Sequence, residues 1–134
     1  MNQWTFSGKR TECQFQALTP ELAKAFYGKP PARTIRGYAA VVDGEPIVLV
    51  GVMRDDHRWV LFSDSKPSAR GQATFTARRL VLAGMKRLQG IMQELNAPVH
   101  AAPQEDAEGA CALLERMGFV HITQGVYQWQ AQPK

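Results

Sequence analysis

The sequence predicts an α/β (α+β) fold with a mixed, mostly antiparallel central sheet and helices on both of its faces. Three features carry this prediction. Consecutive strand patterns fill residues 35–64, an amphipathic segment covers about 72–96, and "ALLERMGFVH" runs from a helix straight into a strand. The predicted order of elements is β-α-β-β-β-α-β-α-β. We expect residues 1–134 to form one domain in which the polar residues 1–10 are loosely held.

Local signals predict the first strand and the first helix. In "TECQFQAL" (11–18) the apolar residues alternate on one face, which indicates a short strand. "TPELAKAFYG" follows, with Thr19 as a natural N-cap and Pro20 at the first helical position. Gly28 ends this short helix, and the prolines after it prevent its continuation.

The middle of the chain is predicted to be a meander of three antiparallel strands. Two β-rich runs flank "DGE" in "TIRGYAAVVDGEPIVLVGVM", which is a hairpin signal. A third strand, "RWVLFSD" (58–64), follows the turn "RDDH". The residues between this strand and the next helix, 65–72, form a loop.

The segment from about Gln72 to Asn96 is predicted to be a long amphipathic helix. Its apolar stripe consists of Ala77, Val81, Gly84, Leu88, Ile91 and Leu95. "VHAA" (99–102) then forms a short buried strand. We expect strands 58–64 and 99–102 to be parallel neighbours, with the helix crossing between them.

The end of the chain pairs a second helix with a returning strand. In "CALLERMGF", Gly118 permits the left-handed turn that ends the helix, and Phe119 anchors the next strand in the core. "FVHITQGVYQWQ" (119–130) closes the chain as one or two strands.

Composition limits the class of protein. The sequence contains no apolar stretch near 18 residues and begins without an apolar signal-peptide core, so we expect a cytoplasmic protein. Its two cysteines, Cys13 and Cys111, match no metal or redox spacing, and we expect them to be buried thiols. No metal site is predicted.

The net charge of +4 permits an anionic ligand without demanding nucleic acid. Lysine and arginine are scattered along the chain, and aromatic residues do not interleave with a basic stripe. We therefore expect solvated basic faces and no nucleic-acid or membrane partner. The chain is compatible with a homo-oligomer.

This element order, together with "ALLERMGFVH", resembles the GNAT superfamily of acyl-CoA-dependent N-acyltransferases. The resemblance covers roughly residues 11–130, and Ala110, Leu113, Gly118 and Phe119 match the helix-Gly-Phe-strand pattern of that family. It implies that acetyl-CoA or another acyl-CoA is the co-substrate and that an unknown amine is the acceptor.

The resemblance also implies where the cofactor binds. The family holds the CoA pyrophosphate at the start of the long helix, where free N–H groups and the helix dipole favour negative charge. The matching run here is "ARGQATF", in which Phe75 replaces a small residue of the family pattern. The residues assigned to the cofactor are Phe62, Ser63, Arg70, Gly71, Gln72, Ala73 and Thr74.

The catalytic positions of the family are not retained. The tyrosine that protonates the leaving thiolate falls on Leu114, and a common asparagine falls on Ala107, so neither side chain can move a proton. The remaining titratable candidates are His57, Asp64, His100 and Tyr127, and each is better explained as a surface or hydrogen-bonded residue. The catalytic residues are therefore unassigned.

Two functions stay open at this point. One is an N-acyltransferase that works mainly by positioning its substrates. The other is a catalytically inactive module of the same shape, used for binding or structure. The hairpin "TIRGYAAVVDGEPIVLVGV" also resembles acetyltransferase-like proteins of phage and prophage genomes, which implies a role in the host cytoplasm or in a virion.

Overall fold

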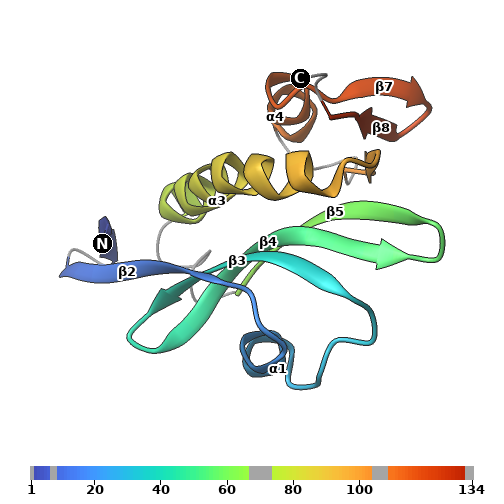
Figure 1. Ribbon diagram of the computed structural model, residues 1–134. Helices are drawn as coiled ribbons and strands as arrows, with labels where there is room; N and C mark the ends of the chain where they lie inside the picture. The colour runs from blue at the N-terminus through green and yellow to red at the C-terminus, as the bar shows by residue number, and fades with distance from the viewer. Residues whose placement is uncertain (1, 7–8, 67–73, 104–108, 132–134) are drawn as a thin grey trace.

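The computed structural model describes residues 2–6, 9–66, 74–103 and 109–131, and its strands form one eight-stranded mixed sheet (Figure 1). The strand order is β1-β2-β3-β4-β5-β6-β8-β7. The strands are β1 (Asn2–Phe6), β2 (Lys9–Ala17), β3 (Ile35–Val42), β4 (Glu45–Asp55), β5 (Arg58–Ser65), β6 (Val99–Ala101), β7 (Val120–Thr123) and β8 (Val126–Trp129). The helices are α1 (Pro20–Tyr27), α3 (Thr74–Leu95) and α4 (Ala110–Arg116). The predicted fold class is confirmed.

The N-terminal segment differs from the sequence prediction. Residues 2–6 form an edge strand, and β2 begins at Lys9, so a β1–β2 hairpin stands where we expected a loosely held segment. The polar residues of this segment are compatible with a strand at the edge of the sheet, because an edge strand pairs with another strand on one side only.

Helices α1 and α3 lie on opposite faces of the sheet (Figure 1). Strand β4 lies between them and is buried on both faces, which explains its nearly continuous apolar run. Val48, Val50 and Val52 pack in the core that includes α3, whereas Leu49 packs with Leu22 and Phe26 of α1. Local signals define α1 as predicted: Thr19 Oγ1 accepts a hydrogen bond from the Leu22 N–H, and Gly28 ends the helix with a φ of 84°.

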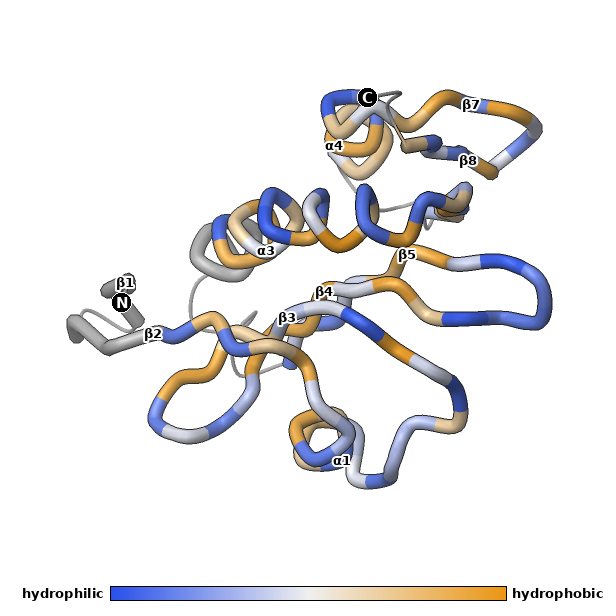
Figure 2. The backbone as a smooth tube through the Cα atoms, in the orientation of Figure 1, coloured by the Kyte–Doolittle hydropathy of each residue, from blue (hydrophilic) through white to orange (hydrophobic). Residues whose placement is uncertain are grey.

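The buried face of α3 is rotated from the predicted stripe. The turns that face the sheet are hydrophobic and those that face away are hydrophilic (Figure 2). Leu80, Leu88 and Met92 are fully buried and Met85 nearly so, whereas Val81, Ile91 and Leu95 pack from the margins. Leu88 and Gly84 were correctly predicted to lie on the buried face. The prediction missed the exact face because apolar residues of α3 occupy more than one side of the helix. Contact with β4 determines which of them face inward.

The predicted parallel pair is confirmed. Trp59 of β5 lies opposite Val99 of β6, and Val60 lies opposite His100. The pairing stops there, although β5 continues to Ser65. The two strands therefore separate beyond Val60.

The end of α4 shows why Gly-Phe stops the helix so sharply. The Gly118 N–H donates to the Glu115 carbonyl, and the Phe119 N–H donates to the Leu114 carbonyl. These bonds, with a φ of 98° at Gly118, form a Schellman motif. Phe119 is 3% exposed and packs in the same core as Leu114, as predicted. The hairpin β7–β8 that follows inserts β8 beside β6 and leaves β7 at the edge of the sheet.

Candidate functional site

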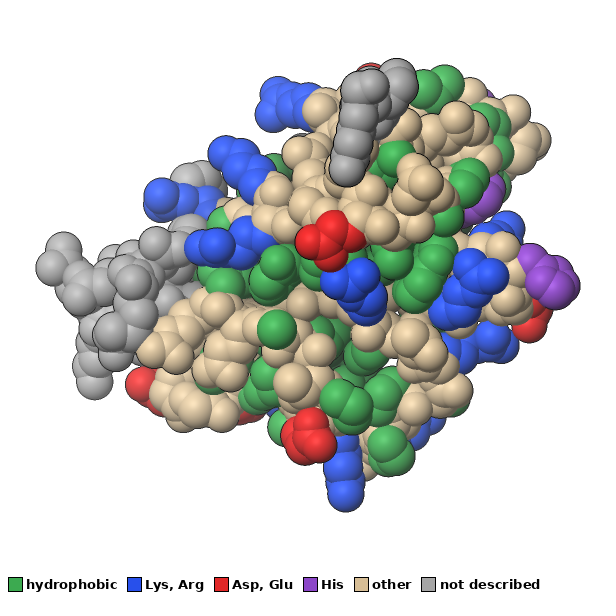
Figure 3. Space-filling model, in the orientation of Figure 1, with side chains coloured by type: hydrophobic (Ala, Val, Ile, Leu, Met, Phe, Trp, Pro, Cys, Tyr) green, Lys and Arg blue, Asp and Glu red, His purple; other side chains and the backbone are tan. Residues whose placement is uncertain are grey.

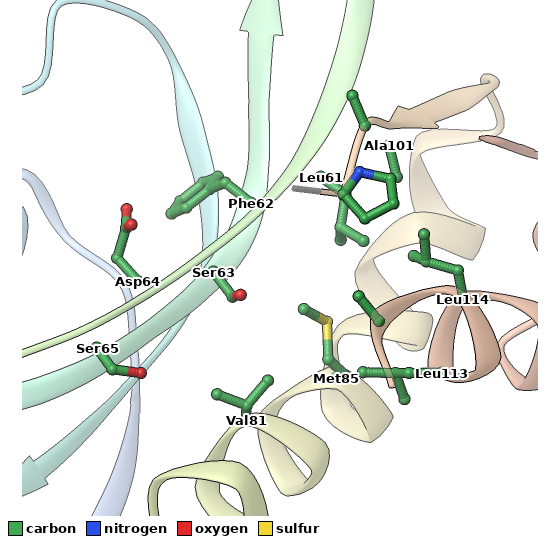
Figure 4. A pocket seen from close by; sticks show the side chains of 13 residues that line it. Leu61, Phe62, Ser63, Asp64, Ser65, Val81, Met85, Ala101, Leu113 and Leu114 are labelled. Atoms are coloured by element: carbon green, nitrogen blue, oxygen red, sulfur yellow. The ribbon is translucent and has the colours of Figure 1, made fainter. Parts of the chain in front are cut away.

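A cavity of about 490 Å³ opens where β5 and β6 separate. Its walls come from β5, from α3, from α4 and from the segment that begins with β6 (Figure 4). The lining residues are Leu61, Phe62, Ser63, Asp64, Ser65, Val81, Met85, Ala101, Ala102, Pro103, Ala110, Leu113 and Leu114. We call this space the splay cavity.

Strand β5 presents a different side chain to each face of the sheet. Ser63 and Ser65 lie opposite Val50 and Val48, so they share the face that α3 covers. Phe62 and Asp64 lie on the opposite face, and Phe62 packs with Leu49 against α1. Figure 4 shows the two pairs projecting to opposite sides of the strand. Residues of β5 can therefore contact ligands on both faces of the sheet.

The backbone of β5 supplies unpaired hydrogen-bonding groups along the splay cavity. The Lys66 N–H donates to the Ile47 carbonyl, and the β4–β5 register continues from that pair without a shift. Because paired and unpaired residues alternate in an antiparallel ladder, the amide groups of Leu61, Ser63 and Ser65 face away from β4. Ser63 and Ser65 lie beyond the β6 pairing, so their amide groups face the gap, where an extended ligand can take the place of a strand.

The wall opposite β5 is apolar. Val81 and Met85 come from α3, and Leu113 and Leu114 come from α4 (Figure 4). Leu114 stands at the position where the family resemblance implies a tyrosine, and it does line the cavity. The site therefore has no hydroxyl at this position.

A short hydrogen bond connects α1 to β5 beside the cavity. The Tyr27 hydroxyl donates to Oδ2 of Asp64. Partial burial, together with this carboxylate, raises the pKa of the Tyr27 hydroxyl well above its usual value of 10. Tyr27 therefore remains a protonated donor throughout the ordinary pH range.

This raised pKa predicts a pH dependence of stability. In the unfolded chain Tyr27 loses its proton near a pH of about 10, whereas in the folded chain it does not. The free energy of unfolding should therefore decrease as pH rises above that value, and Tyr27→Phe should make the decrease shallower. Urea denaturation of both proteins at about pH 8 and about pH 11 measures the difference. Equal decreases in the two proteins would show that Tyr27 ionises equally well in the folded state.

The residues assigned to the cofactor are only partly described. Phe62 and Ser63 line the splay cavity, and their role in binding a cofactor stays a prediction. Arg70, Gly71, Gln72 and Ala73 lie outside the described residues. Thr74 begins α3, but its side chain and that of Phe75 are not described. The predicted phosphate-binding loop stays a prediction.

Of the four titratable candidates, Asp64 is the one that lines the splay cavity. His57 is exposed in the turn at the other end of β5. The His100 Nε2 lies 3.3 Å from the Gln128 amide nitrogen, and Tyr127 is buried on β8. Ala107 lies outside the described residues.

The prediction that Cys111 is a buried thiol is wrong, because this cysteine is exposed. Ala110, Leu114 and Met117 turn toward the interior, and Cys111 lies about 100° around the helix from Ala110. A hydrogen bond with Cys111 raises the pKa of the Tyr127 hydroxyl. The Cys13 side chain is not described.

On the face that Figure 3 shows, basic residues lie at several separate places. Several are held by acidic neighbours: Arg33 with Asp55 at 3.0 Å, Arg36 with Glu94 at 3.1 Å and Lys66 with Glu45 at 3.1 Å. Within the described ranges, no group of three or more histidine, cysteine or acidic residues could hold a metal ion. None of the described helices combines the length and apolarity that crossing a membrane requires.

The sequence matches no family model and no curated protein. Its structure, in contrast, resembles the ribosomal-protein-S18-alanine N-acetyltransferase of Escherichia coli with a TM-score of 0.64 at 13% identity, covering 92% of this chain and 97% of that one. The chain has the GNAT acetyltransferase fold. Two further GNAT-type structures match with a TM-score of 0.49 each. They are the GNAT domain of Streptomyces lividans PAT (12% identity, 95% and 93% covered) and the N-acetyltransferase-like YhhK of E. coli bound to coenzyme A (14% identity, 90% and 99% covered).

Within the GNAT fold, sequence reasoning missed most of the splay cavity. The wall from α3 was not assigned to a site, Leu114 of α4 was named only as the position of the family tyrosine, and the bond between Tyr27 and Asp64 was not foreseen. A signal for the β5 wall was present, since Ser63 and Ser65 are polar residues on a face that is otherwise apolar.

Proposed function

We propose that this protein binds an acyl-CoA in the splay cavity and transfers its acyl group to an amine. The observation that supports this most strongly is the separation of β5 from β6 beyond Val60, which leaves one edge of β5 without a strand partner. The fold shared with an N-acetyltransferase supports the reaction class only by analogy.

The described residues that line the splay cavity fit the extended arm of an acyl-CoA, which contains amide and methylene groups. The backbone amides of Ser63 and Ser65 offer hydrogen-bond donors and acceptors to the amide groups of the arm. Val81, Met85 and Leu113 offer the apolar wall against which its methylene groups pack. The cavity volume of about 490 Å³ is suited to this arm, and the phosphates would extend toward the start of α3.

A bound acyl-CoA supplies a thioester: the amine nitrogen bonds to the acyl carbon, the carbon–sulfur bond breaks, the sulfur leaves as a thiolate or thiol, and the amine proton passes to solvent. The chain contributes mainly orientation, since Leu114 has no proton to give. The rate then depends on holding both substrates in place.

Calorimetric titration with acetyl-CoA and with free CoA tests the proposal. We expect both to bind with dissociation constants on the order of micromolar to tens of micromolar, because both carry the same arm. An absence of heat at about millimolar ligand would overturn the proposal.

A second candidate function is binding without transfer, and the apolar Leu114 favours it. It predicts that CoA and acetyl-CoA bind but that no thiol is released with any amine. Measuring thiol release with a panel of primary amines separates the two functions.

A further inference from the structure

A second cavity of about 380 Å³ lies on the α1 face of the sheet. Its walls come from the end of α1, the segment that follows it, and strands β3, β4 and β5. Its lining residues are Tyr27, Lys29, Pro30, Pro31, Ala32, Arg33, Ile35, Met53, Phe62 and Asp64. We call it the α1 cavity.

The two cavities meet at β5. Phe62 and Asp64 line both of them, so a ligand in the α1 cavity lies beside a ligand in the splay cavity. Because these side chains project to the α1 face, the α1 cavity is where a second substrate can approach without displacing the first.

The α1 cavity combines a mostly apolar lining with one carboxylate. Pro30, Pro31, Ile35, Met53 and Phe62 supply most of the apolar wall. Asp64 accepts a hydrogen bond from Tyr27, but a carboxylate can accept about four, so capacity for a further donor remains. Among the residues that the structure describes, no ion pair involves Asp64.

The basic residues of the α1 cavity do not neutralise this carboxylate. The Arg33 guanidinium lies 3.0 Å from Asp55 and 3.7 Å from Asp56, which are its partners. Lys29 is exposed and forms no ion pair with Asp64 within the described part of the chain. The carboxylate is therefore available to a cation that comes from outside.

We propose that the α1 cavity binds a primary alkylammonium group, with its charge at Asp64 and its hydrocarbon body against Met53 and Phe62, and that this group becomes the acyl acceptor once it has lost one proton to solvent, which frees the nitrogen lone pair for attack on the thioester. The assignment as acceptor rests on the proposed function; the binding site does not. The chemistry favours an aliphatic amine over an acidic or polyhydroxylated acceptor, because the wall offers few polar partners. The alternative is that Tyr27 and Asp64 only fasten α1 to β5.

Methionine methyl groups give a separate reporter for each cavity. Met53 lines the α1 cavity, Met85 lines the splay cavity, and the buried Met92 and Met117 line neither. In protein carrying isotope-labelled methionine methyl groups, we expect hexylamine to shift the Met53 resonance and CoA to shift the Met85 resonance. Hexanol has the same hydrocarbon body without the charge. The concentration of hexanol needed to shift the Met53 resonance should be at least about tenfold higher than that of hexylamine.

The variant that isolates the charge is Asp64→Asn, which still accepts the Tyr27 hydrogen bond. It should weaken hexylamine binding about tenfold or more and leave hexanol unaffected. Asp43→Asn is the matched control, since Asp43 lies in the β3–β4 turn outside both cavities, at a φ of 51° that asparagine tolerates.

The outcomes separate the two proposals. An unshifted Met53 resonance, or equal binding of hexylamine by wild-type protein and Asp64→Asn, overturns the amine site. A Met53 response without any Met85 response to CoA overturns the acyl-transfer proposal and leaves the amine site standing.

Discussion

Replacing Gly84 with alanine should lower the free energy of unfolding by about 1–3 kcal/mol, although alanine is the better helix former. Gly84 lies on the buried face of α3, where the helix passes over β4. A Cβ atom at this position would lie 2.6 Å from one methyl carbon of Val50 and 3.2 Å from the other. Val50 is fully buried in the middle of β4 and has little freedom to move aside. The helix must therefore move away from the sheet or distort it.

Gly90 provides a matched control on the same helix. It is exposed, and a Cβ atom there would have no neighbour within 4 Å. Gly90→Ala should raise the free energy of unfolding by about 0.5–1 kcal/mol, because glycine loses more backbone entropy on folding. Urea denaturation measures both variants. Equal stabilisation by the two substitutions would contradict the close packing of α3 on Val50.

Gly84 illustrates how far the sequence could predict α3. Its spacing placed Gly84 and Leu88 on the buried face, and both lie there. The exact face was missed because Leu80, Met85 and Met92 are as apolar as the residues chosen instead. Only the contact with β4 decides between two adjacent stripes on such a helix.

The meander and the final helix were easier to predict because local chemistry determines them. Asp43 and Gly44 have φ angles of 51° and 80°, which suit the two-residue turn that "DG" predicted. Gly118 likewise ends α4 through hydrogen bonds to carbonyls only a few residues away. Such features depend on neighbours in sequence, so they can be read without the tertiary structure.

The candidate site depends on contacts between distant segments. Tyr27 and Asp64 are 37 residues apart, and nothing in either local sequence indicates their hydrogen bond. The splay cavity likewise requires β5, α3 and α4 to be assembled first. Phe62 and Ser63 were named from the family resemblance and do line this cavity, and their role in holding a cofactor stays a prediction.

The two cavities have a common origin in β5. If β6 were longer, its pairing would cover the edge of β5 and close the splay cavity. Because β6 ends at Ala101, all five residues of Leu61–Ser65 line the splay cavity, and Phe62 and Asp64 also line the cavity on the α1 face. The short pairing of β5 with β6 is therefore the structural basis of the proposed site.

Filling the splay cavity should abolish most CoA binding. Ala110, the first residue of α4, lines the cavity and is partly exposed, so Ala110→Phe should place a ring in the space that the proposed ligand needs. We expect the dissociation constant for CoA to rise at least about tenfold, which corresponds to about 1.4 kcal/mol, as measured by calorimetry. The fold should tolerate the change because the ring enters an existing cavity instead of a packed core.

Ala112→Phe separates the effect of filling the cavity from the effect of a ring on α4. Ala112 lies on the same helix, is exposed and does not line the cavity. This control should bind CoA as the wild-type protein does, and thermal unfolding should show that both variants are folded. Unchanged CoA affinity in Ala110→Phe would mean that CoA binds elsewhere on the protein. Equal losses in both variants would mean that a ring on α4 disturbs the site indirectly, because of these two alanines only Ala110 lines the cavity.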